Sequence, residues 1–150
     1  MNQTISIARY GLAYLLWAVT VALAVVALLV WRSTAFIILG MTPWDRYAEY
    51  ALNQFGFLLI AIVTLGMIIF SENYYRTGVD RHQLWKRFFQ LTMIEVLVLA
   101  IAHVIQWIGG IVLDFAQSPV SPLILIGELV VAILLFFLQR QVQQRANSTL

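Results

Sequence analysis

Three ionisable side chains interrupt the long apolar stretches of this 150-residue sequence: Glu95, His103 and Glu128. Burying a charge in hydrocarbon costs about 2.5–3.5 kcal/mol even on lenient insertion scales, so such residues normally face protein or water and often mark a site. Spaced titratable groups are also what a proton or ion path requires. The alternative is structural, because polar contacts of this kind commonly join two helices.

The spacing of polar and small residues around Glu95 defines one face of a predicted helix. At ~100° per residue, a single stripe collects the following residues: Glu95, Ala102, Gln106 and Gly109, with His103 and Gly110 near its edge. Small residues let helix backbones approach, and polar ones find hydrogen-bond partners at such contacts. We therefore expect this stripe to pack against other helices.

The depth of the ionisable residues predicts which of them meet. At ~1.5 Å per residue, His103 lies roughly 15 Å and Glu128 roughly 12 Å from the end that their two helices share. An antiparallel hairpin could therefore pair them. Glu95 lies roughly 9 Å from the opposite end of its helix, near enough for Lys86 or Arg87 to lean toward it.

Cofactor and catalytic chemistry have weaker support in the sequence. A single histidine such as His103 could supply one axial ligand to a haem or chlorophyll-type pigment, but no second histidine lies in an apolar run. No H-E-x-x-H or G-x-S-x-G motif is present, and the absence of cysteine excludes thiolate metal sites and thiol redox chemistry. We predict no catalytic residues, no enzyme activity, no metal site and no resident cofactor.

The elements that must position these residues are four apolar runs, at about 11–30, 51–70, 89–113 and 120–138. Each is close to the ~20 residues that a helix needs to cross ~30 Å of hydrocarbon. The composition is 62% hydrophobic and 11% charged, far from that of soluble domains. The sequence predicts an all-α integral membrane protein, an antiparallel bundle of four transmembrane helices that forms a single domain over residues 1–150.

The distribution of Lys and Arg predicts the orientation. Seven of the nine basic residues fall on one predicted side: Arg9, Arg76, Arg81, Lys86, Arg87, Arg140 and Arg145. Only Arg32 and Arg46 fall on the other side. The positive-inside rule therefore places both termini and a loop at about 71–87 in the cytoplasm, and a bacterial inner membrane is the expected location.

The predicted cytoplasmic loop carries a basic cluster: Arg76, Arg81, His82, Lys86 and Arg87. The simplest interpretation is a topology determinant that touches anionic lipid headgroups. A docking surface for a partner protein or a phosphate-bearing ligand is the alternative. Aromatic residues flank the runs on both sides, which favours a membrane belt over a base-stacking surface, so no nucleic acid is expected: Tyr10, Trp31, Trp44, Tyr47, Tyr50, Tyr74, Tyr75 and Trp85.

Local signals predict where the helices begin. Thr42 before Pro43, with Asp45 following, is typical of the start of the second helix, and Asp80–Gln83 resembles a capping box for the third. The segment 35–41 is apolar but too short to cross a bilayer, so it either lies in the interface or folds back on the bundle.

These features favour a small non-catalytic accessory or assembly subunit, packed against other membrane subunits of a larger and possibly energy-transducing complex, or self-associated. A small oligomeric transporter or ion channel that uses Glu95, His103 and Glu128 is the alternative. A haem or pigment carrier through His103 is the second alternative.

Overall fold

The computed structural model describes the chain except residues 1, 44, 81–82, 115–119 and 148–150. The described part consists of four α-helices joined by short connections. Their bounds are α1 Asn2–Gly40, α2 Arg46–Asp80, α3 Leu84–Val112 and α4 Val120–Asn147.

Each helix contains a segment long and apolar enough to cross a membrane: Ile7–Gly40, Arg46–Val79, Leu84–Val112 and Pro122–Gln144. The predicted all-helical architecture with four such helices is therefore confirmed. The helices are longer than the apolar runs suggested, because hydropathy marks only the part of a helix that suits hydrocarbon. The 39 residues of α1 rise roughly 58 Å, about twice the thickness of a bilayer core.

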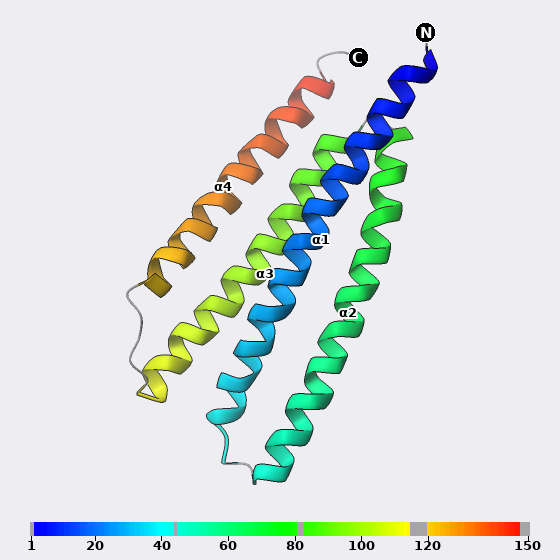
Figure 1. Cartoon of the computed structure of the whole chain (residues 1–150). Coiled ribbons are helices and arrows are strands. Elements are labelled where there is room, and N and C mark those ends of the chain that lie inside the picture. Colours follow the sequence, from blue (N-terminus) through cyan, green and yellow to red (C-terminus); the bar gives the residue numbers. More distant parts are fainter. Residues whose placement is uncertain (1, 44, 81–82, 115–119, 148–150) are drawn as a thin grey trace.

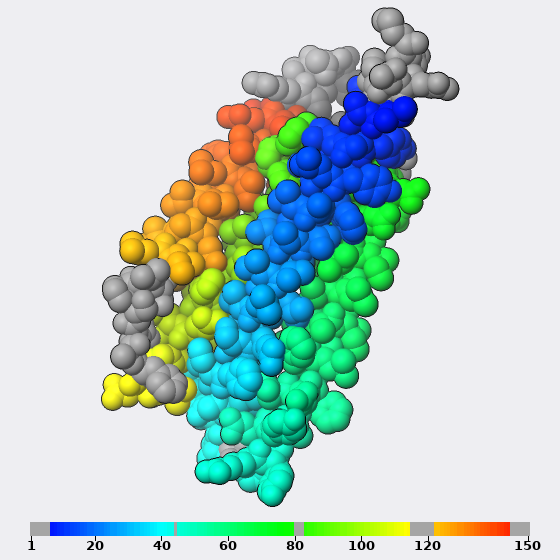
Figure 2. Space-filling view, viewed as in Figure 1, coloured from blue at the N-terminus to red at the C-terminus, as the bar shows by residue number. Residues whose placement is uncertain are grey.

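The helices lie side by side in the order α4, α3, α1, α2 (Figure 1). Successive helices run in opposite directions, so the N- and C-terminal ends lie at one end of the molecule, while α1 and α3 run parallel. Within the described residues, α4 packs only on α3, and α2 packs mainly on α1. Figure 2 shows α4 and α2 on opposite flanks of the molecule. The described helices thus form a bundle in which α4 and α2 do not close a ring.

The apolar core lies toward the end that holds both termini. There α1 contributes Ala13 and Leu16, α2 contributes Tyr75 and Val79, and α3 contributes Leu91. The Tyr75 side chain is only 1% exposed. Its hydroxyl shares a 2.8 Å hydrogen bond with Thr20 of α1, so burial of this phenol does not leave its polar atom unsatisfied.

A glycine sets the distance between α1 and α3 near the opposite end. A Cβ atom built on Gly109 would come within 2.2 Å of Ile37 Cγ2 and 2.8 Å of Met41 Cε. Ala102, two turns earlier on α3, is completely buried. The predicted stripe of small residues is therefore the face on which α3 meets its neighbours, as expected for close helix packing.

Two segments expected to be irregular are helical. The predicted loop 71–87 is wrong as a loop, since α2 continues through Asp80 and α3 begins at Leu84. Likewise, residues 35–40 continue α1 and do not fold back. In both places local helix propensity is modest, and tertiary packing of residues such as Tyr75, Val79 and Ile37 favours the helix beyond the strongest apolar run.

The caps also differ from the predicted ones. The Asp45 carboxylate accepts a 2.8 Å hydrogen bond from the backbone N–H of Ala48, so Asp45 caps α2 in the place expected for Thr42. Asp80 ends α2, and Gln83 precedes α3 without a side-chain capping bond. The predicted helix start at Asp80–Gln83 is therefore about three residues too early, and Arg81 and His82 of the predicted capping box lie outside the described residues.

Candidate functional site

His103 and Glu128 form the contact predicted from their equal depth. His103 Nδ1 lies 2.8 Å from Oε1 and 3.0 Å from Oε2 of Glu128. The two side chains are 19% and 15% exposed, so the pair lies between α3 and α4 with partial access. An ion pair or a neutral hydrogen bond fits this geometry, and either joins the two helices.

Gln106 is a hydrogen-bond donor to α1. Its Nε2 atom lies 3.1 Å from the Val30 carbonyl oxygen, 2.9 Å from Ser33 Oγ and 2.9 Å from Thr34 Oγ1. Thr34 is completely buried and also donates to the Val30 carbonyl, at 2.9 Å. One amide thus closes a small polar network at the α1–α3 contact in an otherwise apolar environment.

Glu95 occupies a different position. Its side chain is buried, with 5% of the residue exposed, and it lines a half-open cavity among α1, α2 and α3. The Oε2 atom has no hydrogen-bond partner among the described residues. The expected contact with Lys86 or Arg87 is not among its interactions, so Glu95 is a buried acid without a counter-charge.

The four polar candidates within the apolar helical segments therefore lie in separate places. His103 faces Glu128 on the α4 side of α3, while Gln106 faces α1 and Glu95 faces the α1–α2 side. Eight residues separate Glu95 from His103, which is roughly 12 Å along the helix axis. The structure brings together one pair of the three titratable groups.

Only some side chains of the basic cluster are exposed at the surface. Arg76 is exposed and Lys86 is half-buried, whereas Arg81 and His82 lie outside the described residues. Arg87 is 9% exposed.

Arg87 of α3 contacts the C-terminal part of α2. Its Nη1 donates to the Tyr74 carbonyl, and its guanidinium lies 4.5 Å from the centroid of the Tyr74 ring. Gly78 is helical and leaves room for Arg87, since a Cβ at Gly78 would lie 2.8 Å from Arg87 Cδ. Arg87 thus contacts α2 in place of Glu95.

Two aromatic residues have roles that a membrane belt does not predict. Trp31 lines the same cavity as Glu95, because α1 continues nine residues beyond Trp31, and Tyr75 is the buried partner of Thr20. The sequence could have indicated a buried Tyr75 only through the distance of this residue from the end of its helix. That distance is known only when residues 71–80 are recognised as helical.

Metal or pigment binding stays a prediction for His103. Among the described residues, no group of three or more His, Asp or Glu side chains could hold a metal ion. The Glu128 contact at Nδ1 fixes the imidazole and leaves Nε2 as the nitrogen for an axial bond, an arrangement common in metal-binding histidines. The donor set is thus compatible with one axial ligand and with nothing more.

Comparison with known proteins gives no match: no family model, curated protein or solved structure is similar to this chain. The function must therefore be inferred from the chain itself.

Proposed function

We propose that the protein is a non-catalytic accessory or assembly subunit, which crosses the bacterial inner membrane four times and packs α2 and α4 against another membrane protein. The observation that carries the proposal is the small share of these two helices that is covered. In the apolar segments, 6% of α2 and 11% of α4 are buried, against 33% of α3.

Glycines on the uncovered faces support a protein partner. Gly66 of α2 and Gly127 of α4 are exposed, and a Cβ at either position would meet no atom within 4 Å. Glycine destabilises a helix relative to alanine by about 1 kcal/mol, so a glycine that packs against nothing inside the molecule has a cost without a benefit. Close approach of a helix from another subunit would supply the benefit.

The proposed orientation places both termini and the α2–α3 connection in the cytoplasm. The basic residues Arg76, Lys86 and Arg140 lie near that end of the helices, and the acidic residues Asp45 and Glu49 lie near the other. The Lys and Arg asymmetry supports this orientation through the positive-inside rule.

Isolation from native membranes in a mild detergent tests the proposal. We expect the wild-type chain to elute with a defined membrane partner, identified by mass spectrometry, in a fixed ratio. The variants Gly66→Phe and Gly127→Phe should lose that partner while remaining helical, and the conservative Gly66→Ala should keep it. A partner-free, monodisperse wild-type protein would contradict the proposal.

A small transporter or channel is a second candidate, and the His103–Glu128 pair favours it. The pair is partly accessible, and its two groups lie in direct contact, with His103 Nδ1 2.8 Å from Glu128 Oε1 and no bridging residue. Reconstituted vesicles with a pH-sensitive dye test this function. Wild-type protein should dissipate a proton gradient and Glu128→Leu should not. Vesicles that hold the gradient equally well with and without the wild-type protein would eliminate this candidate.

A further inference from the structure

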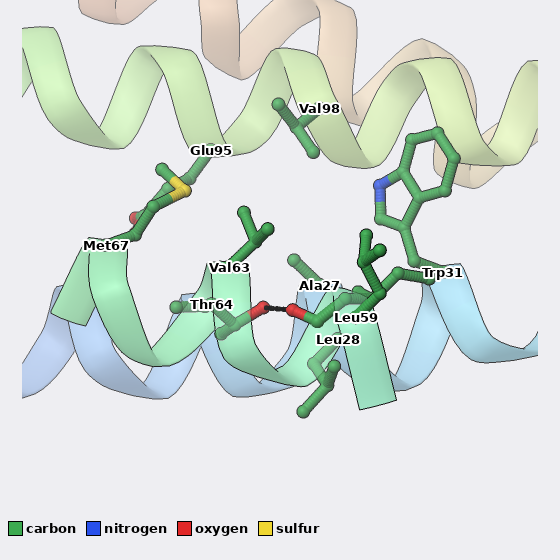
Figure 3. A pocket seen from close by; sticks show the side chains of 11 residues that line it. Ala27, Leu28, Trp31, Leu59, Val63, Thr64, Met67, Glu95 and Val98 are labelled. Carbon is green, nitrogen blue, oxygen red and sulfur yellow. Dashed lines mark hydrogen bonds between the residues drawn. The ribbon is translucent and has the colours of Figure 1, made fainter. Parts of the chain in front are cut away.

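A cavity of about 250 Å³ lies among α1, α2 and α3, and none of its lining residues comes from α4. In Figure 3, Glu95 of α3 and Trp31 of α1 lie at opposite ends of this cavity. Apolar side chains make up most of the wall between them, including Ala27, Val63 and Val98. The cavity is thus an apolar chamber with a polar group at each end.

Both polar ends lack a hydrogen-bond partner among the described residues. Glu95 Oε2 is a buried acceptor and Trp31 Nε1 is a buried donor, and neither atom has a partner. Thr64, the remaining polar residue of the wall, is satisfied by its own helix through a 2.9 Å bond to the Ile60 carbonyl. An unsatisfied buried polar group costs about 1–3 kcal/mol, so two that line one cavity require an explanation.

The dimensions of the cavity limit what could satisfy both atoms. A cavity of about 150 Å³ accommodates benzene, so 250 Å³ has room for one substituted ring but not for an entire long-chain lipid. The apolar wall favours a hydrocarbon ring. The two ends require oxygen atoms on opposite sides of that ring, one that bonds to the Glu95 carboxyl group and one that accepts from the Trp31 indole.

We propose that this cavity binds the ring of a lipid-soluble aromatic diol, the quinol class of compounds. One quinol hydroxyl donates to Glu95 Oε2, and the oxygen on the opposite side of the ring accepts from Trp31 Nε1–H. The buried Glu95 carboxyl group has no counter-charge among the described residues, so it can carry a proton and donate to a carbonyl oxygen. The quinone, which is the oxidised form of the same ring, therefore also fits both ends of the cavity.

The packing of the helices gives such a ligand a route from the bilayer. α1 packs closely on both α2 and α3, whereas α2 and α3 meet over only a small contact. The α2 wall of the cavity includes Val63 and Leu59, which are 55% and 65% exposed at the outer surface of the helix. A hydrocarbon tail on the ring can leave through this α2–α3 seam into the lipid.

Three molecules of the same shape test the proposal: tetramethylhydroquinone, tetramethylbenzoquinone and tetramethylbenzene. Each is equilibrated with the full-length protein in nanodiscs and with empty nanodiscs, and the hydroquinone is kept reduced by dithionite under anaerobic conditions. We expect saturable binding of one hydroquinone per chain, and we expect the hydroquinone and the quinone each to bind more tightly than the hydrocarbon. One well-formed hydrogen bond corresponds to a change of about tenfold.

Two variants remove one polar end each. Glu95→Leu and Trp31→Phe should each weaken the binding of the hydroquinone and of the quinone by about tenfold. Glu72→Gln and Trp85→Phe make matched changes outside the cavity and should leave binding unchanged. Ala27→Leu keeps both polar atoms but fills the chamber, and it should abolish binding in a protein that remains helical and monodisperse.

Three results would overturn the proposal. The first is equal affinity for all three molecules, which would indicate partition into an apolar space. The second is binding no stronger than to empty nanodiscs. The third is unchanged hydroquinone affinity in the correctly folded Ala27→Leu protein. None of these depends on whether the protein has a partner subunit, so the accessory function and the ligand site fail separately.

Discussion

Three polar side chains of α3 each form a hydrogen bond to a different neighbouring helix. Gln106 donates to α1, His103 pairs with Glu128 of α4, and Arg87 binds the Tyr74 carbonyl of α2. Such bonds specify which faces meet, because apolar side chains have no preferred partner when the surroundings are also apolar. Glu95 Oε2 and Thr92 Oγ1 differ from these, since neither atom has a hydrogen-bond partner in the described structure.

The His103–Glu128 contact should show measurable coupling. His103→Leu and Glu128→Leu each leave a partly buried polar partner, and each should lower the free energy of unfolding by about 1–3 kcal/mol. The double variant should cost less than the sum, with a coupling energy of about 0.5–3 kcal/mol. Reversible unfolding in mixed micelles measures these values. Strict additivity would show that the contact contributes nothing.

Gln106→Leu should loosen the α1–α3 contact. The change removes the donor shared by Val30, Ser33 and Thr34, and the expected loss is about 0.6–1.7 kcal/mol of unfolding free energy, the range of hydrogen bonds between membrane helices. Gln143→Leu makes the same replacement at an exposed position of α4 and should change stability little. Equal effects of the two variants would mean that the amide network is not stabilising.

At the scale of helices, the sequence predicted the number and type of elements and the main contact face of α3. It predicted these because apolar runs and the 100° spacing are local properties. The pairing of His103 with Glu128 followed from depth alone. The position of Trp31 could not be predicted, because hydropathy marks where hydrocarbon ends but not where a helix ends. The cavity could not be predicted either, because it depends on the spacing of three helices that only tertiary packing sets.

The close approach of α1 and α3 makes Gly109 sensitive to substitution. In Gly109→Ala the added methyl group must displace Ile37, and we expect a loss of about 1–3 kcal/mol of unfolding free energy from overpacking. Gly127→Ala places the same group in open space and should be neutral or stabilising by up to about 1 kcal/mol. Measurement of both variants in one detergent separates packing from helix propensity. A Gly109→Ala protein as stable as the wild type would contradict the close contact.

The whole molecule presents an open row of four helices whose ends alternate between two sides. Since the polar connections lie at the two ends of this row, the proposed orientation can be examined directly at those connections. The sequence contains no cysteine, so a single introduced thiol reports its own location without interference.

Single-cysteine labelling should place the two ends of the row on opposite sides of the membrane. In intact bacterial cells, Thr42→Cys at the α1–α2 connection should react with a membrane-impermeant maleimide, and Gln83→Cys at the α2–α3 connection should react only after lysis. Both positions are exposed, so burial within the protein would not protect them. The reverse pattern would invert the orientation, and labelling of both would contradict the four crossings.

If the chain is inserted into a bilayer, as we propose, the helix order α4, α3, α1, α2 allows its two halves to be inserted one after the other. Each half of the sequence is an antiparallel hairpin, and the halves meet mainly along the parallel α1–α3 contact. The first hairpin can therefore be inserted and paired while the second is still being synthesised. In the proposed membrane location, assembly then requires only that the α1–α2 pair and the α3–α4 pair associate within the plane of the bilayer. The hydrogen bond from the Gln106 amide to α1 would stabilise their contact.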